Sequence, residues 1–379
     1  MVQIRRLTGA EMQEAIRLSD ATFRDGNQTS MGQLFPFLFS EAALHLSYGA
    51  FEEDGKLVSF MGVVLWTIRI GEAALRVASL GSVCTEPSAR GKGYASLLLE
   101  QVQSFTRDAG ASLLLVSGDR SLYTRAGCAL FGRISKYRMD ALHAESFMGG
   151  SEAKGEIREM RPDDLFALQE AAETREVRYQ VGVNELGTLL KAEAMAGVMR
   201  MNQRVLVEGT KGIGTSFAVI GVTSETQPKG TVLEYAGDSD KVVRLFAEAV
   251  NRFGLQSLEI PIPWHEKDIH ERLSAIPSTE DGQPGTVKIL SGEALMDQLS
   301  PWLEKRGDVS GLRLNRMENS GWELSDSTGR PSVTLNDEEL IRLLFDRIGT
   351  DAVLLPAEAQ AYRELFPIPF PYTAGLCFV

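Results

Sequence analysis

Hydrophobic and polar positions along the first 143 residues alternate in a way that predicts strands and helices in mixed order. Gln3–Leu7 has the pattern of a short strand, and Thr8-Gly-Ala-Glu11 is a capping box that opens a helix. Three strand-length runs rich in apolar, β-branched and aromatic residues follow, and the turn Glu53-Asp54-Gly55 joins the first two into a hairpin. These runs are Leu46–Glu52, Leu57–Ile70 and Ala74–Thr85.

The next segment changes to helical spacing. Apolar residues fall on one side of Gly91–Ala109, and Ser112–Val116 then returns as a buried strand. A strand, a helix and a second strand in this order form a crossover unit. The sequence therefore predicts a mixed α/β (α+β) fold for this part of the chain.

The same order returns, more faintly, after residue 155. Glu156–Met160 is strand-like, Pro162–Arg175 begins with proline and acidic residues as a helix does, and two hairpin strands flank Gly209–Gly214. The repetition predicts an internal duplication. Its strand, helix and strand are Thr231–Gly237, Asp240–Phe253 and Leu255–Ile260.

Two breaks divide the chain into three expected domains. Small and polar residues replace the hydrophobic pattern at His143–Gly155, as in a linker, and turn-forming residues gather at Pro277–Pro284. Acidic and basic side chains are equal in number over residues 1–150, so the whole net charge of −12 falls in residues 151–379. We expect domains at 1–143, 154–283 and 284–379, the last a small α+β unit.

Composition narrows the classes of function. With a pI near 5.0, the chain lacks the basic surface that binds phosphate backbones, so we expect no nucleic-acid partner. Apolar runs such as Met61–Trp66 are far shorter than the about 18 residues that cross a bilayer, and the N-terminus lacks the apolar region of a signal peptide. Three cysteines without CxxC spacing argue against disulfides and a zinc cluster. We expect a cytoplasmic protein without a membrane span or a metal.

The segment that carries chemistry is Leu80–Ser96, where an apolar strand runs through a polar turn into Arg90-Gly91-Lys92-Gly93-Tyr94-Ala95 at a helix start. The two glycines let the backbone approach a ligand, the first helical amides point outward, and Arg90 and Lys92 add two cations. This combination suits a diphosphate. The spacing R-x-x-G-x-A differs from the P-loop and from the dinucleotide-binding GxGxxG. The alternative, glycines that only shape an exposed turn, is disfavoured by the surrounding order of strand, loop, helix and strand.

In this setting the sequence resembles the GNAT acyltransferase superfamily, whose acetyl-CoA site is an R/Q-x-x-G-x-G/A loop after the fourth strand, matched by Arg90, Gly93 and Ala95. The length and the three-part layout resemble the Eis-like (enhanced intracellular survival) branch, which joins a GNAT domain, a degenerate second GNAT domain and a C-terminal sterol-carrier-like domain. The resemblance implies a duplicated GNAT acyl-CoA N-acyltransferase fold with acetyl-CoA as cosubstrate. We also expect a homo-oligomer.

By this resemblance, the backbone of Val83 and Thr85 would hold the acetyl carbonyl and the pantetheine arm, and Arg90 to Tyr94 would hold the diphosphate. Tyr123 matches the family's tyrosine beside the cofactor sulfur, where a phenol can return a proton to the departing thiolate. The alternative for Tyr123 is a cap on a short helix. Cys128 stands where the family usually has an aromatic residue.

Eis-like proteins use the free C-terminal carboxylate as base, which here is the carboxylate of Val379. The alternative is a tail that packs for stability alone. The resemblance also places Phe23 and Asp25 in the amine pocket, because a carboxylate beside aromatic rings suits a cation. Phe35, Phe37 and Phe39 lie near them in sequence, and ordinary core is the alternative for these rings.

The second domain lacks the loop. Where its helix begins, Asp238 and Asp240 take the place of a diphosphate and would repel it, and Gly209–Gly214 is read as a turn. We expect one cofactor site per chain. His265 and His270 are expected on a surface helix, and we assign none of the four histidines, His45 and His143 included, to a metal or to catalysis.

These observations lead to an N-acetyltransferase that moves acetyl from acetyl-CoA to a primary amine by direct attack. The acceptor is a small molecule or a peptide: an aminoglycoside-like polyamine, a small amine or a lysine side chain. The alternative is a non-catalytic acyl-CoA- or lipid-binding regulatory protein, against which Tyr123 and the complete loop argue.

Overall fold

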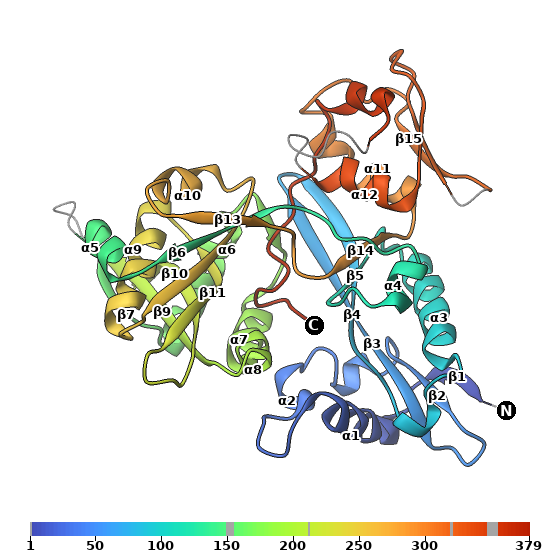
Figure 1. Cartoon of the computed structure of the whole chain (residues 1–379), viewed down its shortest axis with the longest axis horizontal. Coiled ribbons are helices and arrows are strands. Elements are labelled where there is room, and N and C mark those ends of the chain that lie inside the picture. The colour runs from blue at the N-terminus through green and yellow to red at the C-terminus, as the bar shows by residue number, and fades with distance from the viewer. Residues whose placement is uncertain (1, 149–154, 211–212, 319–320, 347–354) are drawn as a thin grey trace. The chain divides into compact units, whose positions relative to one another are not determined.

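The computed structural model describes residues 2–148, 155–210, 213–318, 321–346 and 355–379 (Figure 1). Contacts divide the chain into two compact units. The first comprises residues 1–132, 284–368 and 379, and the second comprises residues 133–283 and 369–378. The chain therefore leaves the first unit and returns to it twice.

The central sheet of the first unit follows the predicted strands. Its neighbouring strands are, in order, β1 (Gln3–Arg6), β2 (Tyr48–Phe51), β3 (Leu57–Ile70), β4 (Ala73–Thr85), β5 (Leu113–Val116) and β14 (Thr286–Ile289). The first four are antiparallel to one another, whereas β4 and β5 run parallel, joined by helix α3 (Tyr94–Asp108). The predicted strand–helix–strand crossover is therefore present.

Side chains alternate between the two faces of this sheet. Met61 of β3 and Leu80 of β4 belong to the core that contains Leu98 and Val102 of α3. Helix α1 (Met12–Phe23) packs on β3 and β4, and its Ser19 contacts Cys84 of β4. In Figure 1, α1 and α3 lie on opposite sides of the β3–β4 hairpin. The shorter helices are η1 (Gly9–Glu11), α2 (Met31–Leu34), η2 (Glu41–Ala43), η3 (Pro87–Ala89) and α4 (Ser121–Arg125).

Residues 284–368 add an α+β region to the first unit. Helix α11 (Gly292–Leu303) packs against β4, and its Gln298 accepts a hydrogen bond from the amide of Arg76 at 2.8 Å. The described residues of this region also form a small antiparallel sheet and further helices: β15 (Arg313–Arg316), β16 (Trp322–Ser325), β17 (Val333–Leu335), α12 (Asp337–Phe345) and η6 (Ala357–Tyr362). Its likeness to a sterol carrier stays a prediction, as does the division into three domains.

The second unit repeats the element order of the first. Its sheet runs β7 (Glu156–Glu159), β9 (Asn202–Thr210), β10 (Ile213–Val222), β11 (Lys229–Ala236), β12 (Ser257–Pro263), β6 (Ile134–Met139) and β13 (Ser278–Asp281). Strands β11 and β12 are parallel, as β4 and β5 are, and α9 (Ser239–Arg252) joins them. The order is that of a duplicated GNAT fold. The remaining elements are η4 (Pro162–Asp164), α6 (Leu165–Glu173), β8 (Val177–Tyr179), α7 (Val183–Ala192), α8 (Ala194–Val198) and α10 (Lys267–Arg272).

Each sheet includes a strand from beyond the expected domain limits. Strand β6 follows the first GNAT-like stretch in sequence but pairs with β12, and β14 follows the second but pairs with β5. The linker expected at 143–155 is wrong in its first part. Residues up to Met148 belong to helix α5 (Ala141–Met148), which packs on α9 and buries Ala144 completely, whereas 149–154 lie outside the described residues.

Candidate active site

Strand β4 carries a bulge where the sequence predicts contact with a thioester. Phe60 pairs with Cys84 and Gly62 pairs with Gly81, so Ser82 and Val83 together stand opposite Met61. Ser82 has a φ of 51°, which is rare for a residue with a side chain. Its hydroxyl donates to Ser19 Oγ of α1 at 2.6 Å. The bulge is therefore fixed to the helix that packs on this face.

The backbone of β4 beyond Leu80 has one open side. Pairing with β5 ends at Leu80 and Val116, whereas β4 continues to Thr85. The amide of Glu86 donates to Val58 of β3 at 2.8 Å. Because backbone groups alternate in direction along a regular strand, those of Thr85 point away from β3, whereas Val83 lies in the bulge, which interrupts the alternation. Beyond Leu80, β5 leaves this edge of β4 uncovered.

The anion loop, residues 90–95, leads from this strand end into α3. Gly91 and Gly93 have φ values of 78° and 81°, and an added Cβ would meet nothing within 4 Å at either position. Glycine is therefore required here by backbone conformation, not by crowding. None of the described residues accepts a hydrogen bond from the amides of residues 91 to 95.

The cations of the anion loop face outward. Arg90 is exposed, and its Nε donates to Thr85 O at 3.2 Å, which holds the loop against the strand end. Lys92 Nζ lies 3.3 Å from Glu52 Oε1 in an exposed pair, which contributes little and can be displaced. The helix N-terminus, the unpaired amides and two cations fit a diphosphate.

Tyr123 lies on α4 with 6% of its surface exposed, in the same core as Leu80 and Val116. Burial raises the pKa of its phenol to about 12, so it stays protonated at neutral pH. No described residue hydrogen-bonds the hydroxyl. Burial likewise raises the pKa of the Cys128 thiol to about 11, which keeps Cys128 a thiol and not a nucleophilic thiolate.

The C-terminal residue packs directly on β4. A Cβ added at Gly81 would lie 2.6 Å from Val379 Cγ1 and 3.0 Å from the carbon of its carboxylate. Opposite it, a Cβ at Gly62 would lie 2.5 Å from Leu38 Cδ1. Sequence reasoning named Val379 but missed this glycine pair. A lone glycine inside an apolar strand was the available signal, since it often marks a close approach.

The expected acceptor residues do not form one cluster. Phe23 ends α1 with 41% of its surface exposed, and the exposed Asp25 accepts a hydrogen bond from the Asn27 amide at 3.3 Å. Phe35 and Phe39 are buried, as the core alternative has it. Two ring contacts involve this group, both at 5.6 Å between centroids: Phe39 stacks on Phe60, and Phe37 meets Trp66 edge-on.

The corresponding helix start of the second unit is already occupied by carboxylates. Asp238 caps α9 by accepting from the Lys241 amide at 3.1 Å, and Asp240 pairs with Arg272 at 2.5 Å. An incoming diphosphate would meet these negative charges. The other glycine-rich segment, Gly209–Gly214, includes residues 211 and 212, which lie outside the described residues.

The expected surface-helix position is wrong for one of the two histidines, His265. His265 precedes α10, keeps only 12% of its side chain exposed, and burial lowers its pKa to about 4. His270 lies on α10, but its Nδ1 is 2.8 Å from Tyr137 Oη and its Nε2 is 3.0 Å from Pro263 O. Over the described ranges, no group of three or more His, Cys, Asp or Glu side chains is arranged to hold a metal ion. Nor does any described helix have the length and apolar character that crossing a membrane requires.

Comparisons with known proteins identify the family of the N-terminal part of the chain. Residues 3–131 match the family model of the acetyltransferase (GNAT) domain. Comparison with curated proteins gives no match.

Solved structures resemble nearly the whole chain. A GCN5-related N-acetyltransferase from Anabaena variabilis is 10% identical with a TM-score of 0.67, and the alignment covers 98% of both chains. Eis1 from Mycobacterium abscessus is 12% identical with a TM-score of 0.66, covering 98% of this chain and 99% of Eis1. A probable N-acyltransferase from Enterococcus faecalis is 14% identical with a TM-score of 0.65, covering 98% of both chains. At these identities the likeness establishes the fold.

Proposed function

We propose that this chain transfers acetyl from acetyl-CoA to a primary amine. The premise is that residues 3–131 form an acetyltransferase domain of the GNAT family. The observation that carries the proposal is the anion loop, whose outward amides and two cations follow directly on the open end of β4. Domains of this family use an acyl-CoA donor. The acceptors that we propose are an aminoglycoside-like polyamine, a small amine or a lysine side chain.

The donor would be held by backbone more than by side chains. The amides of residues 91 to 95, with Arg90 and Lys92, would bind the diphosphate, and Ala95 keeps the first helical turn open to it. Backbone groups of Val83 and Thr85 would hold the pantetheine arm and the acetyl carbonyl. A carbonyl held by amide donors is polarised where charge develops during transfer.

Two groups would move protons. Acetyl-CoA supplies an activated thioester carbonyl, and a neutral amine attacks it while the bond to sulfur breaks. The Val379 carboxylate would accept the proton that the attacking nitrogen loses, because it lies on β4 next to the bulge. The Tyr123 phenol would donate a proton to the departing sulfur, since burial keeps it protonated. Phe23 and Asp25 would then contact the acceptor.

The test is a panel of amines with purified full-length chain and acetyl-CoA, measured by release of free thiol and by the mass of the product. An aminoglycoside, spermidine and a lysine-containing peptide cover the three acceptor classes. We expect amine-dependent thiol release well above hydrolysis, with a product heavier by one acetyl group. Binding of acetyl-CoA without any amine-dependent release would instead favour the non-catalytic regulator.

A further inference from the structure

The second unit contains a pocket that sequence reasoning did not find. It is a partly open hollow in the surface of this unit. Its walls come from α6, β8, α7, β10, β11 and the tail. By element order, α6, α7, β10 and β11 correspond to α1, α2, β3 and β4 of the first unit, the elements beside the proposed acceptor site. The pocket therefore occupies the acceptor side of a GNAT-like unit whose cofactor loop is absent.

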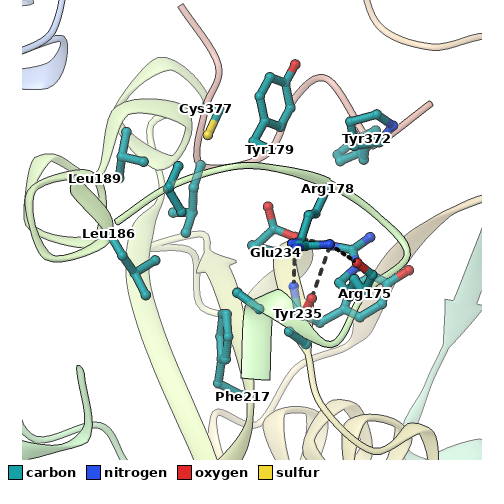
Figure 2. Close-up of a pocket in the computed structure, with 15 residues that line it drawn as sticks. Arg175, Arg178, Tyr179, Leu186, Leu189, Phe217, Glu234, Tyr235, Tyr372 and Cys377 are labelled. Carbon is teal, nitrogen blue, oxygen red and sulfur yellow. Dashed lines mark hydrogen bonds and ion pairs between the residues drawn. The ribbon is translucent and has the colours of Figure 1, made fainter. Parts of the chain in front are cut away.

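One side of the pocket is apolar and the other is charged. Figure 2 shows Leu186, Leu189 and Phe217 apart from Arg175 and Glu234. The tail contributes further surface, and three tyrosine rings, from β8, β11 and the tail, line the same space. Walls of this make-up suit a small molecule with an apolar body and one polar end.

The charged side includes a carboxylate oxygen, Glu234 Oε2, to which no described residue donates a hydrogen bond. Arg175 Nη1 donates to Glu234 Oε1 at 2.6 Å, and its Nη2 donates to Glu266 Oε1 at 2.7 Å. The amide of Tyr235 also donates to Glu234 Oε1, at 3.3 Å. No described residue hydrogen-bonds Glu234 Oε2, although Glu234 lines the pocket with 22% of its side chain exposed.

The arginines of the wall do not meet this need. Arg175 directs its donors to the two carboxylates and to Tyr235 O, and Arg178 Nη1 donates to Arg175 O at 2.7 Å. A half-buried carboxylate oxygen is best completed by a charged donor, and tyrosine rings attract a cation. Burial also raises the pKa of Glu234, a shift that a bound cation would reverse.

We propose that this pocket binds a small apolar primary amine, with its ammonium on Glu234 Oε2 and its body against Leu186, Leu189 and Phe217. The site is separate from the anion loop and transfers no acetyl group. It gives the second unit a binding function that does not depend on acetyl transfer by the first.

The test measures binding of phenethylamine to the full chain by calorimetry without acetyl-CoA, beside 2-phenylethanol and 3-phenylpropanoate as neutral and anionic probes. We expect the amine to bind at least tenfold more tightly than either. Glu234→Gln should weaken the amine at least tenfold, whereas Glu225→Gln, at an exposed loop position, should leave it unchanged. Equal binding of the amine by both variants, or tighter binding of the anionic probe, would overturn the proposal.

A second variant keeps the proposal testable if Glu234→Gln does not fold. A Cβ added at Gly375 would lie 3.0 Å from Glu234 Oε2, so Gly375→Ala crowds that oxygen and keeps the Arg175 pair. We expect at least threefold weaker amine binding. Adding a residue after Val379 removes the free terminal carboxylate but should leave this binding intact. Loss of binding in that extended chain would assign the amine to the first unit, and no binding of the amine to the unmodified chain would end the idea.

Discussion

Gly62 and Gly81 are the residues of the β3–β4 hairpin on which the position of Val379 depends. They pair across the hairpin. Because glycine has no side chain, Leu38 and the terminal residue can approach the backbone closely here. Gly81 is not among the glycines with positive φ, so alanine can adopt its backbone conformation. Any effect of a side chain at this position is therefore steric.

Gly81→Ala should displace the chain terminus and slow acetyl transfer. The added methyl would lie 2.6 Å from Val379 Cγ1, a distance at which one of the two must shift. We expect kcat to fall at least tenfold with the KM for acetyl-CoA unchanged, because a misplacement near 1 Å costs this much or more. Carboxypeptidase should also trim the variant faster.

The control for this substitution is a compensating change. Val379→Ala removes the Cγ1 atom that clashes with the Cβ added by Gly81→Ala. The double variant should therefore regain activity and resistance to carboxypeptidase. A single Gly81→Ala chain that resists trimming as the unmodified chain does would show that the terminal residue does not need this space. Faster trimming without loss of activity would separate the packing from the proposed base.

Tyr123→Phe tests the proposed acid at the same scale. The phenol has no described hydrogen-bond partner, so removing it leaves no broken pair behind. We expect kcat to fall by about 10²–10⁴ with little change in acetyl-CoA affinity. Because the pKa of Tyr123 is raised to about 12, the two pH profiles of kcat should run parallel from pH 6 to 10. Converging profiles below pH 10, or an unchanged kcat, would remove Tyr123 from this role.

At the scale of elements, the junction of β4 and α3 depends on left-handed glycines. Gly93→Ala forces φ near 81° on a residue with a Cβ, at a cost of about 1–2 kcal/mol. We expect the loop to relax and the Kd for acetyl-CoA to rise about tenfold. Gly254→Ala is the matched control, because Gly254 also has a positive φ, 60°, and equally open space, and it lies in the second unit. Equal affinity in both variants would mean that the loop does not bind the diphosphate.

Local patterns were enough to predict most elements. The capping box at Thr8 forms with Glu11. The periodicity of apolar residues predicted the strands, the crossover helices and their repeated order. The segment 143–155 was misjudged because α5 is short and only weakly amphipathic. The surface position expected for His265 was wrong because no local pattern in the sequence shows its burial.

The candidate site was predictable where its residues are consecutive. The anion loop is continuous in sequence, and its glycines have the conformation that such a loop requires. The hydrogen bond from Ser82 to Ser19, and the contact of Gly81 with Val379, join residues far apart in the chain. No spacing rule links them. The pocket around Glu234 was missed because its walls come from several elements, including the tail.

At the scale of the molecule, each sheet is completed by a strand from outside its own repeat. Strand β14 forms the edge beside β5, pairing Thr286 with Val116 through Ile289 with Leu113. Strand β6 lies between β12 and β13 in the other sheet. Sequence order alone would assign each strand to the preceding repeat, because strands adjacent in sequence usually pair. The exchange makes each sheet dependent on a distant part of the chain.

This exchange predicts how the chain can be divided. A fragment of residues 1–143 lacks β14, so the wholly buried strand β5 becomes an apolar edge, and its β6 has no partner. We expect this fragment to aggregate and to show no cooperative thermal unfolding.

A second fragment should fold: residues 1–132 joined by a short Gly-Ser linker to 284–368. Ala129 and Val287 exchange backbone hydrogen bonds of 3.0 and 2.9 Å, so the ends to be joined lie close together. Scanning calorimetry and acetyl-CoA binding distinguish the two fragments, and we expect only the second to unfold cooperatively and to bind acetyl-CoA. A monomeric, cooperative 1–143 fragment with full affinity would show that β14 is dispensable and that the first repeat folds alone.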